Sequence, residues 1–484
     1  MKRIKSYIPK YRVLKAEAEY VHKLLRGYSE PDKRLFNHIL QSNSRQHHQH
    51  PAGSPIPWTT IQKHLPGAVG FRLSPFVEIG GFWPGHCREF RVKDEYLLEY
   101  LRISTQMSAE KYLQEPKICF DTGRLMNSPP RSRVTDSSRN PLPRWTRTSI
   151  EVLVRNGCLA NLAAIEAHVH KRGADLDEAK LYLDKDSREF KRIKGRYIND
   201  SSCRAAFLDY KPVQYSGDIW FYTPAWEAKS TGRLHVHGGC MQSASGEMKR
   251  LAYSGIDDLK NYDIKSSQVF ITIMLLEQAG LDASWLIEYI DTPNYKVEYG
   301  NRAGIPGDLF KRIVIAMCMG AHLPKTTQNA EYRENSILDY LVEAAQDAHH
   351  LSVLLKSLRE IVEPLAAVLK QWHKYLLDEY IPQNKKGAYL PNAVGRHLNL
   401  NELRLNHPQY KWSDVSKVAA HLLQGLEAAC IQEMIARSDE ANFAPISCEH
   451  DGFIVSSGEP DLQLWNEITE RYGLGGMMLV CKDL

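Results

Sequence analysis

Hydrophobic and polar positions repeat with helical spacing over most of this chain and with strand-like spacing in a few short runs. Apolar residues that recur every three to four positions predict helices. This spacing is found at 8–26, 93–115, 148–172, 175–198 and about 335–380. The apolar run DIWFYTP, which begins at Asp218, predicts a strand. The polar, Pro- or Gly-containing stretches 41–57 and 383–400 predict loops, and no internal repeat is evident.

Composition places the chain among ordinary globular proteins. Its 484 residues allow two to four domains, and 43% of them are hydrophobic and 25% charged. No charge-free apolar run is long enough to span a membrane, and the N-terminus MKRIKSYIPKYR has no apolar signal core. We therefore expect a cytoplasmic protein with no membrane partner.

The cysteines and the charges narrow the picture only slightly. The nine cysteines are scattered and never spaced as CxxC, so we expect reduced, apolar fillers and neither a disulfide framework nor a zinc ribbon. The net charge of +5 permits a polyanionic partner without requiring one. Lys and Arg gather at 124–147 and 185–196, which suits binding to a nucleic-acid backbone. A linker explains the first of these segments equally well.

Two aspartates stand at the ends of apolar runs far apart in the sequence. Asp263, in NYDIKSSQVFI, is expected where a buried strand turns into a helix, and Asp451, in CEHDGFIVSS, lies in a tight turn between two strands. Each alone is typical of a turn or helix cap. If the two carboxylates meet, their repulsion calls for divalent cations, and two Mg²⁺ ions suit attack on phosphorus.

A helix between these two sites carries a third candidate group. In GDLFKRIVIAMCMGAH the side chains of Lys311, Ile315 and Met319 share one face. The lysine could neutralise a triphosphate and protonate the leaving pyrophosphate, while Met319 stacks on an incoming base. The alternative is an amphipathic helix with an exposed Lys-Arg pair.

Six short blocks follow one another along the chain: STGRL (230–234), DIKSSQ (263–268), the helix 311–320, GAYLPNAVGR (387–396), Gln424-Gly425 as a helix start, and His450-Asp451. In this order they resemble the blocks of family A DNA polymerases, the group of bacterial polymerase I, and more distantly those of the single-subunit phage and mitochondrial RNA polymerases. The resemblance covers roughly half of the chain. The resemblance implies an α+β right-hand fold with an antiparallel palm sheet, helical fingers and a mostly helical N-terminal region.

The resemblance also implies roles for individual residues. Two Mg²⁺ ions, which Mn²⁺ can replace, would be held by Asp263, Asp451 and the carbonyl of Ile264. The catalytic set would be Asp263, Asp451 and Lys311. The nucleoside triphosphate would contact Lys311, Arg312, Ile315, Met319, Gly320 and Gln268. The DNA primer-template would contact Arg233 and Gln424 in the minor groove, His450 at the terminal primer phosphate, and Arg396.

Three positions depart from the family pattern. Gly307 stands where an arginine is usual. Either Arg312 or Arg302 takes over its phosphate contact, or the affinity for the nucleotide is lower. Met319 replaces a tyrosine and Gln268 a glutamate, and in the family those two side chains bond each other and crowd the 2′ position of the sugar. Selection between deoxyribonucleotides and ribonucleotides is therefore open.

The blocks divide the chain into expected parts. These are a region of unknown role (1–147), a basic helical hairpin joined by Arg-Gly-Ala that is a candidate thumb (148–214), a first palm segment (215–279), fingers (280–382) and a second palm segment (383–484). The hairpin could grip a duplex backbone, or it could simply present a charged face to solvent.

Other candidate sites are weaker. The loop histidines His47, His48 and His50 lack acidic or cysteine companions, so we expect no metal there. Three possible zinc ligands, His235, His237 and Cys240, lack a fourth, and we assign this block to the primer strand. The run FDTGR (120–124) has an aspartate without the glutamate that a proofreading exonuclease needs, so we expect no proofreading.

Three functions remain. The first is a template-directed DNA polymerase using dNTPs on a DNA primer-template; its protein partners are left open. The second is an RNA polymerase or primase with relaxed sugar selection. The third is an inactive nucleic-acid-binding homologue, against which the joint presence of Asp263, Asp451 and Lys311 argues.

Overall fold

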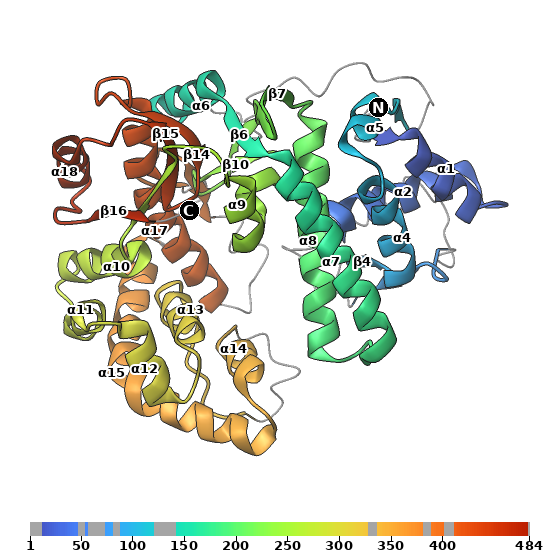
Figure 1. The fold of residues 1–484 in the computed structure, drawn as a ribbon. Helices are drawn as coiled ribbons and strands as arrows, with labels where there is room; N and C mark the ends of the chain where they lie inside the picture. Colours follow the sequence, from blue (N-terminus) through green and yellow to red (C-terminus); the bar gives the residue numbers. More distant parts are fainter. Residues whose placement is uncertain are drawn as a thin grey trace, which may run out of the picture.

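The structure is a computed structural model that describes residues 12–46, 54–56, 73–80, 88–120, 142–327, 336–380, 389–400 and 411–482. Figure 1 shows three groups of elements: a sheet and its helices, a helical group below them, and a long helix pair with the N-terminal elements on the other side. Within the described ranges, no helix combines the length and apolar character that crossing a bilayer requires.

The N-terminal elements form a core of their own. They are β1 (Arg12–Leu14), α1 (Lys15–Leu24), α2 (Glu30–Gln46), β2 (Ser54–Ile56), β3 (Val77–Ile79), β4 (Arg88–Val92), α4 (Asp94–Thr105), α5 (Ala109–Gln114) and β5 (Lys117–Cys119). Helical spacing correctly predicted α1 and the α4–α5 pair. The core joins Phe36, Phe90 and Leu101 to Leu176 and Phe190 of the long helix pair.

The predicted helical hairpin exists, but its boundaries were wrong. The elements are α6 (Arg144–Asn156), β6 (Cys158–Asn161), α7 (Leu162–Tyr182) and α8 (Arg188–Asp209). Helix α7 runs through Arg172-Gly173-Ala174, where we expected the turn. Gly173 lies close to α8, because a Cβ there would be 3.5 Å from the ring of Tyr197. The real turn is at 183–187.

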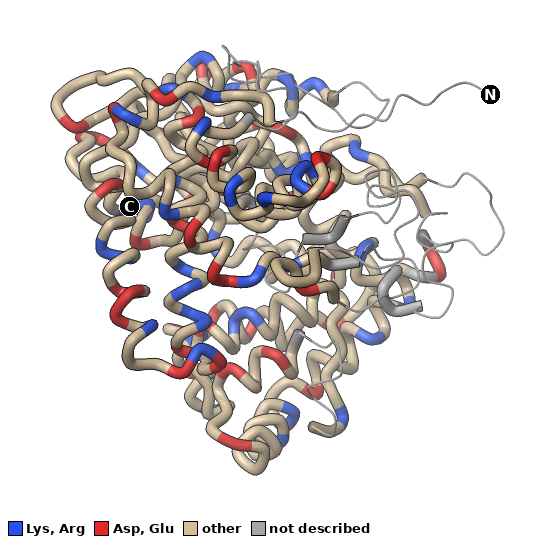
Figure 2. Tube along the Cα trace, turned by 90° about the vertical axis from the view of Figure 1, so that its right-hand side faces the viewer, with Lys and Arg blue, Asp and Glu red and all other residues tan. Residues whose placement is uncertain are grey.

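The basic character of α8 is largely compensated. Lys194 pairs with Asp94 at 2.6 Å, Lys191 with Asp186 at 3.9 Å, and Arg192 with Glu189 at 3.8 Å. Figure 2 shows basic and acidic residues interspersed along the described chain. The hairpin is therefore not a uniformly positive surface.

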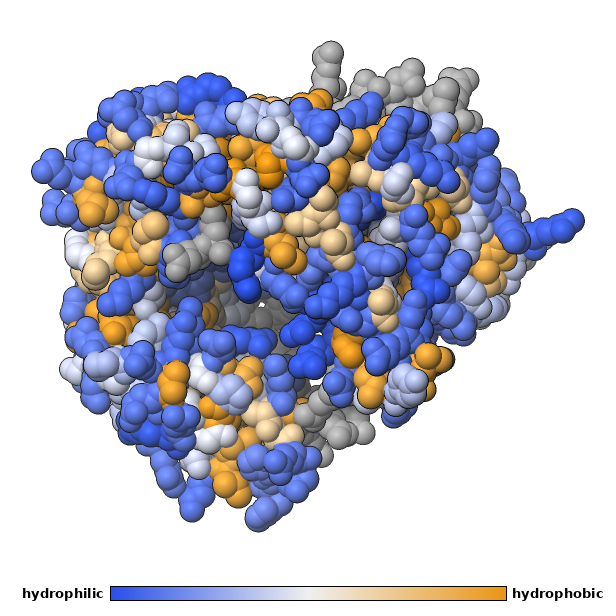
Figure 3. Space-filling model, viewed as in Figure 1, coloured by the Kyte–Doolittle hydropathy of each residue, from blue (hydrophilic) through white to orange (hydrophobic). Residues whose placement is uncertain are grey.

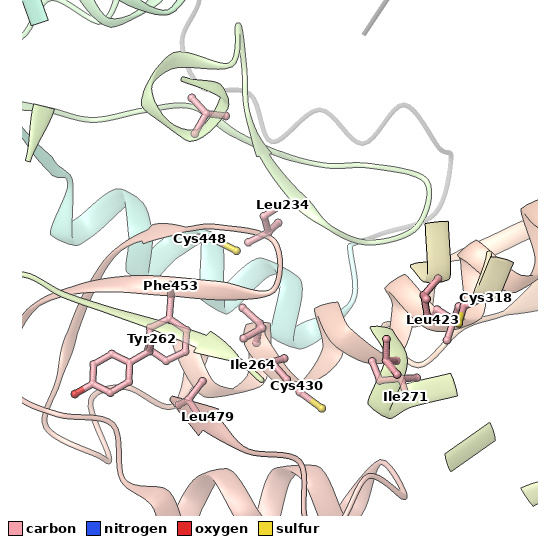
Figure 4. Packing of buried hydrophobic residues seen from close by; sticks show 14 of the residues in the cluster. Leu234, Tyr262, Ile264, Ile271, Cys318, Leu423, Cys430, Cys448, Phe453 and Leu479 are labelled. Carbon is pink, nitrogen blue, oxygen red and sulfur yellow. The ribbon is translucent and has the colours of Figure 1, made fainter. Parts of the chain in front are cut away.

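A four-stranded antiparallel sheet lies at the centre of the C-terminal half. Its order is β14 (Ala444–Cys448), β15 (Gly452–Ser457), β11 (Lys260–Ile264) and β16 (Leu479–Lys482). Tyr262 and Ile264 face the core, where the Tyr262 ring stacks on Phe453 with ring centroids 5.9 Å apart (Figure 4). Because strand side chains alternate, Asp263 points to the opposite face.

Short hairpins and a helical group complete the fold. The hairpin strands are β7 (Val213–Ser216), β8 (Ile219–Tyr222), β9 (Trp226–Ala228), β10 (Leu234–Val236), β12 (Tyr389–Pro391) and β13 (His397–Asn399). The helices are η1 (Cys240–Ser243), α9 (Gly246–Ala252), α10 (Ser267–Gln278), α11 (Ser284–Asp291), α12 (Tyr295–Ala303), α13 (Gly307–Cys318), α14 (Ser336–Ala344), α15 (Ala348–Tyr380), α17 (Lys411–Ala436) and α18 (Leu462–Arg471). The strand predicted in DIWFYTP is β8, and the predicted tract 335–380 is α14 and α15.

The three groups surround a hollow in the molecular surface. Figure 3 shows this hollow near the middle of the molecule, and hydrophilic residues line most of what is visible of it. The sheet, the helices α10–α15 and the pair α7–α8 lie around it in Figure 1.

Candidate active site

The sheet brings Asp263 and Asp451 together, which is the arrangement that the resemblance implied. Asp263 lies opposite Gly452 in the β11–β15 pairing, and the N–H of Ile264 donates to the carbonyl of Asp451 at 2.8 Å. Both aspartates therefore lie at the same end of two neighbouring strands. The approach requires Gly452, since a Cβ there would be 2.2 Å from the carbonyl oxygen of Tyr262.

The turn before β15 fixes the second aspartate. The N–H of Asp451 donates to the Glu449 carbonyl at 3.0 Å, and the N–H of Glu449 donates to the Gly452 carbonyl at 2.8 Å. His450 takes a positive φ of 71°, a conformation that costs energy for a residue with a side chain. Such local strain is common where a structure holds a functional group in place.

Burial and neighbouring carboxylates make the charged form of Asp451 unfavourable. Burial, then Asp263, then Glu427 raise the pKa of Asp451 to about 7. A cation beside the pair would remove this penalty, and carboxylate oxygens are the ligands that Mg²⁺ prefers. In the described ranges no three His, Cys, Asp or Glu side chains form a metal-binding group. Two carboxylates, the Ile264 carbonyl, water and substrate phosphates would suffice for Mg²⁺.

Glu427 is a third acidic residue at the site, and the sequence analysis missed it. It lies on α17, is fully buried, and forms an ion pair with Arg233. The hydroxyl of Ser267 donates to its other oxygen at 2.7 Å. Burial raises the pKa of Glu427, against the effect of Arg233. The only signal in the sequence is a glutamate inside the apolar run HLLQGLEAAC.

Helix α17 also ties two hairpins to the site. The amide of Gln432 donates to the Gly232 carbonyl at 2.6 Å, and the amide of Asn392 donates to the Thr231 carbonyl at 2.9 Å. Gly425 permits the contact with the second hairpin, because a Cβ there would be 2.5 Å from the Asn392 side chain. Gln424-Gly425 lies in the middle of α17, so our expectation of a helix start was wrong. Gln424 is half-buried.

Three of the predicted ligand-binding residues carry buried polar atoms with no hydrogen-bond partner among the described residues. These atoms are Nε of Arg233, Oε1 of Gln268 and Nδ1 of His450. Leaving such atoms unpaired costs about 1–3 kcal/mol each. A bound nucleotide or nucleic acid offers donors and acceptors that would satisfy them.

His450 is held in its neutral form. Burial, then His235, Arg233 and Lys249 lower its pKa to about 3. Its ring lies beside that of His235, with centroids 4.4 Å apart. At neutral pH it can donate one hydrogen bond to a phosphate but carries no charge.

The helix predicted to bind the triphosphate is α13. Ile313, Val314 and Met317 are buried, while Lys311, Ile315 and Met319 are half-buried on another face, as the spacing predicted. Helix α13 packs against α10, which follows Asp263 directly. At its end, a Cβ on Gly320 would be 2.9 Å from the Ser416 backbone of α17.

Arg312 does not share the face of Lys311. Its guanidinium lies 4.3 Å from the Tyr340 ring centroid and 3.4 Å from Glu343, both on α14. Arg396 is only 8% exposed, and its N–H donates to Asn392 at 3.0 Å within the β12–β13 turn. In this conformation the Arg312 side chain is directed toward α14.

The weaker candidates have different outcomes. His235, His237 and Cys240 do not form a metal-binding group among the described residues, and burial raises the pKa of Cys240 to about 12. Seven of the eight described cysteines are buried, as expected of apolar fillers, and Cys481 is exposed. His47, His48, His50 and most of FDTGR lie outside the described residues.

Comparisons with known proteins do not show the family of this chain. No family model matches the chain, and no curated protein matches it. One similar solved structure is the polymerase domain of Pol1 from M. smegmatis, in complex with DNA primer-template and dNTP. The identity is 13% and the TM-score 0.44, over 70% of this chain and 69% of that one. A likeness this distant carries no argument about activity.

Proposed function

We propose that this protein is a template-directed DNA polymerase of the family A type, without proofreading. One observation carries the proposal: Asp263 and Asp451, far apart in the sequence, lie at the same end of two adjacent strands, Asp263 on β11 and Asp451 in the turn before β15. The blocks around Arg233, Asn392 and Gln424 meet beside them through α17. A palm of β11 and β14–β16, fingers of α10–α15 and a thumb of α7–α8 would then surround the hollow in Figure 3.

Different residues of the chain would have different roles in phosphoryl transfer. Two Mg²⁺ ions, held by Asp263, Asp451 and the Ile264 carbonyl, would activate the 3′-hydroxyl and stabilise charge on the phosphate. Lys311 would bind the triphosphate and protonate the pyrophosphate. Most of the rate enhancement would then come from positioning and charge neutralisation.

The primer terminus would be held by neutral or paired groups. Arg233 and Gln424 would contact minor-groove acceptors, which are similar for all base pairs and therefore suit a copying enzyme. The unpaired Nε of Arg233 supports this role, because it needs an acceptor. Neutral His450 would donate to the terminal phosphate.

A second function, RNA synthesis as a polymerase or primase, is favoured by one observation. Oε1 of Gln268 is buried without a hydrogen-bond partner among the described residues, and Met319 has no hydroxyl to offer it. The two side chains that would crowd the 2′ position are therefore not bonded to each other. A ribose hydroxyl could donate to Gln268 instead.

Primer extension tests both functions. The protein is given a defined primer-template and Mg²⁺ with dNTPs or NTPs, next to Asp451→Ala and a control, Asp291→Asn, at an exposed site on α11. Incorporation of dNTPs by wild type and control alone supports the proposal. Products made de novo from NTPs support the second function. DNA binding without incorporation under any condition would favour an inactive homologue.

A further inference from the structure

Lys482 contacts the proposed metal ligand Asp263. Its ammonium forms an ion pair with Oδ2 of Asp263, with side chains that are 51% and 18% exposed. The register explains the contact: β16 runs antiparallel to β11, with Lys482 opposite Asn261. Because side chains alternate along a strand, Lys482, Asn261 and Asp263 share one face, and a lysine reaches its diagonal neighbour.

This ion pair uses a carboxylate oxygen that a metal ion would need. Two ion pairs among the described residues involve these acidic groups: Arg233 is bound to Glu427, and Lys482 is bound to Asp263. An ammonium and a divalent cation at the same oxygen compete, both by charge and by space. Lys482 is exposed enough to leave without disturbing the core.

A second hydrogen-bond acceptor is available to the Lys482 ammonium when it moves away from Asp263. Oδ1 of Asn261 is buried and has no hydrogen-bond partner among the described residues. Asn261 lies directly opposite Lys482 in the pairing of β11 with β16. The ammonium can therefore reach an unsatisfied acceptor on the same face of the sheet.

We propose that Lys482 is the counter-ion of Asp263 in the metal-free protein and that a divalent cation displaces it toward Asn261. The inference rests on the proposed function, since it assumes a metal at Asp263. Its consequence is that the chain lowers its own metal affinity. Removing the lysine then strengthens metal binding, although most substitutions near a metal site weaken it.

Equilibrium Mn²⁺ binding to the full chain, without DNA or nucleotide, measures this competition. Free Mn²⁺ is followed by electron paramagnetic resonance. A partly exposed ion pair is worth up to about 1 kcal/mol, which is about a 5-fold change in affinity, so Lys482→Gln should bind Mn²⁺ about 2- to 5-fold more tightly. Lys482→Arg should resemble wild type. The matched control is Lys260→Gln, which makes the same charge change at the exposed ion pair of Lys260 with Glu459; Lys260 lies on β11, the strand that carries Asp263.

A double-mutant cycle tests the second position of the lysine. Asn261→Leu removes the waiting acceptor and should weaken Mn²⁺ binding a few-fold in the wild-type background. With Lys482→Gln already present, the same change should have no effect, because no ammonium needs the acceptor. Equal effects in both backgrounds would overturn the role of Asn261.

The outcomes separate this inference from the proposed function. Mn²⁺ binding that Asp451→Asn abolishes and Lys482→Gln strengthens supports both. If Asp451→Asn abolishes binding but Lys482→Gln matches or weakens wild type, the counter-ion role is wrong and the metal site stands. If neither wild type nor Lys482→Gln binds Mn²⁺ at millimolar concentration, the proposed metal site falls and the inference with it.

Discussion

Two buried charged clusters in this protein are built in opposite ways. Each guanidinium nitrogen of Arg204, on α8, donates to an acceptor. Nε and Nη2 donate to the Glu166 carboxylate at 3.0 and 2.7 Å. Nη1 donates to the Ser104 carbonyl at 2.9 Å, and Nη2 donates also to the Met107 carbonyl at 2.7 Å. Around Asp451 the largest charge effects come from two other carboxylates, Asp263 and Glu427. Arg233, Gln268 and His450 each retain an unpaired atom among the described residues.

The difference indicates what each cluster is for. Arg204 joins α8 to the α4–α5 turn and to α7, and its pairing is complete within the protein. The cluster around Asp451 is incomplete without a ligand. Natural sequences satisfy their buried polar groups except where function requires otherwise, so unpaired groups gathered in one place indicate a binding site.

Asp451→Asn is expected to have the largest effect of these substitutions, with a large loss of activity and no loss of stability. Losing a metal ligand should lower nucleotide incorporation at least about 10³-fold, since it removes charge stabilisation at the transferring phosphate. The melting temperature of the metal-free protein should stay equal or rise, because a buried negative charge beside Asp263 is gone. Primer extension and calorimetry measure the two effects. A large loss of stability would mean that the aspartate is structural.

Arg204→Met should behave in the opposite way. It leaves Glu166 and two buried carbonyls without their donor, which costs about 3 kcal/mol or more. Denaturant unfolding measures the loss. Incorporation per folded molecule should be unchanged, because the residue is remote from the carboxylate pair. Unchanged stability would contradict the structural role.

The two clusters should also differ in their response to pH. The pKa of Asp451 is about 7 in the folded protein against an ordinary value of 3.8, so the folded state holds this proton more tightly. The metal-free protein should therefore lose a few kcal/mol of stability as pH rises from about 4 to about 7, since each unit of pKa shift is worth about 1.4 kcal/mol. Thermal melts in EDTA measure it. Asp451→Asn should flatten the profile, and Arg204→Met should not.

The smallest effect is expected from a double substitution that lets positions 319 and 268 form a hydrogen bond. Met319→Tyr with Gln268→Glu supplies a hydroxyl donor and an acceptor, which should bond and crowd the 2′ position. Discrimination against ribonucleotides should rise about 3- to 10-fold, the range that modest changes of fit produce. Competitive single-nucleotide incorporation measures it. An unchanged dNTP/NTP ratio would remove Met319 and Gln268 from sugar selection.

Local sequence pattern was enough to predict the strands and turns that carry the aspartates. The apolar approach to Asp263 and the His-Asp-Gly turn at Asp451 are signals contained within about ten residues. Their pairing depends on sheet register, which is non-local, so the residue pattern alone left it open and only the resemblance of the six blocks implied it.

Features set by tertiary contacts were not predicted. Gly173 is an ordinary turn signal, but here it lies inside a helix, where α8 passes close by. The start of α17 lies well before Gln424, since the periodic pattern has no break at Gly425. Glu427 and Lys482 could not be assigned, because each acquires its role only from a residue far away in the sequence.

Glu427 links three separate segments of the chain at a single buried carboxylate. It receives the Arg233 guanidinium from the β9–β10 turn and the Ser267 hydroxyl from the start of α10. A relative with an apolar residue in place of this glutamate would leave the buried arginine without its ion-pair partner. A relative that replaced the arginine would leave the buried glutamate without its partner in the same way. We therefore expect descendants of this sequence to keep Arg233 and Glu427 together or to exchange them together, so the two positions should covary.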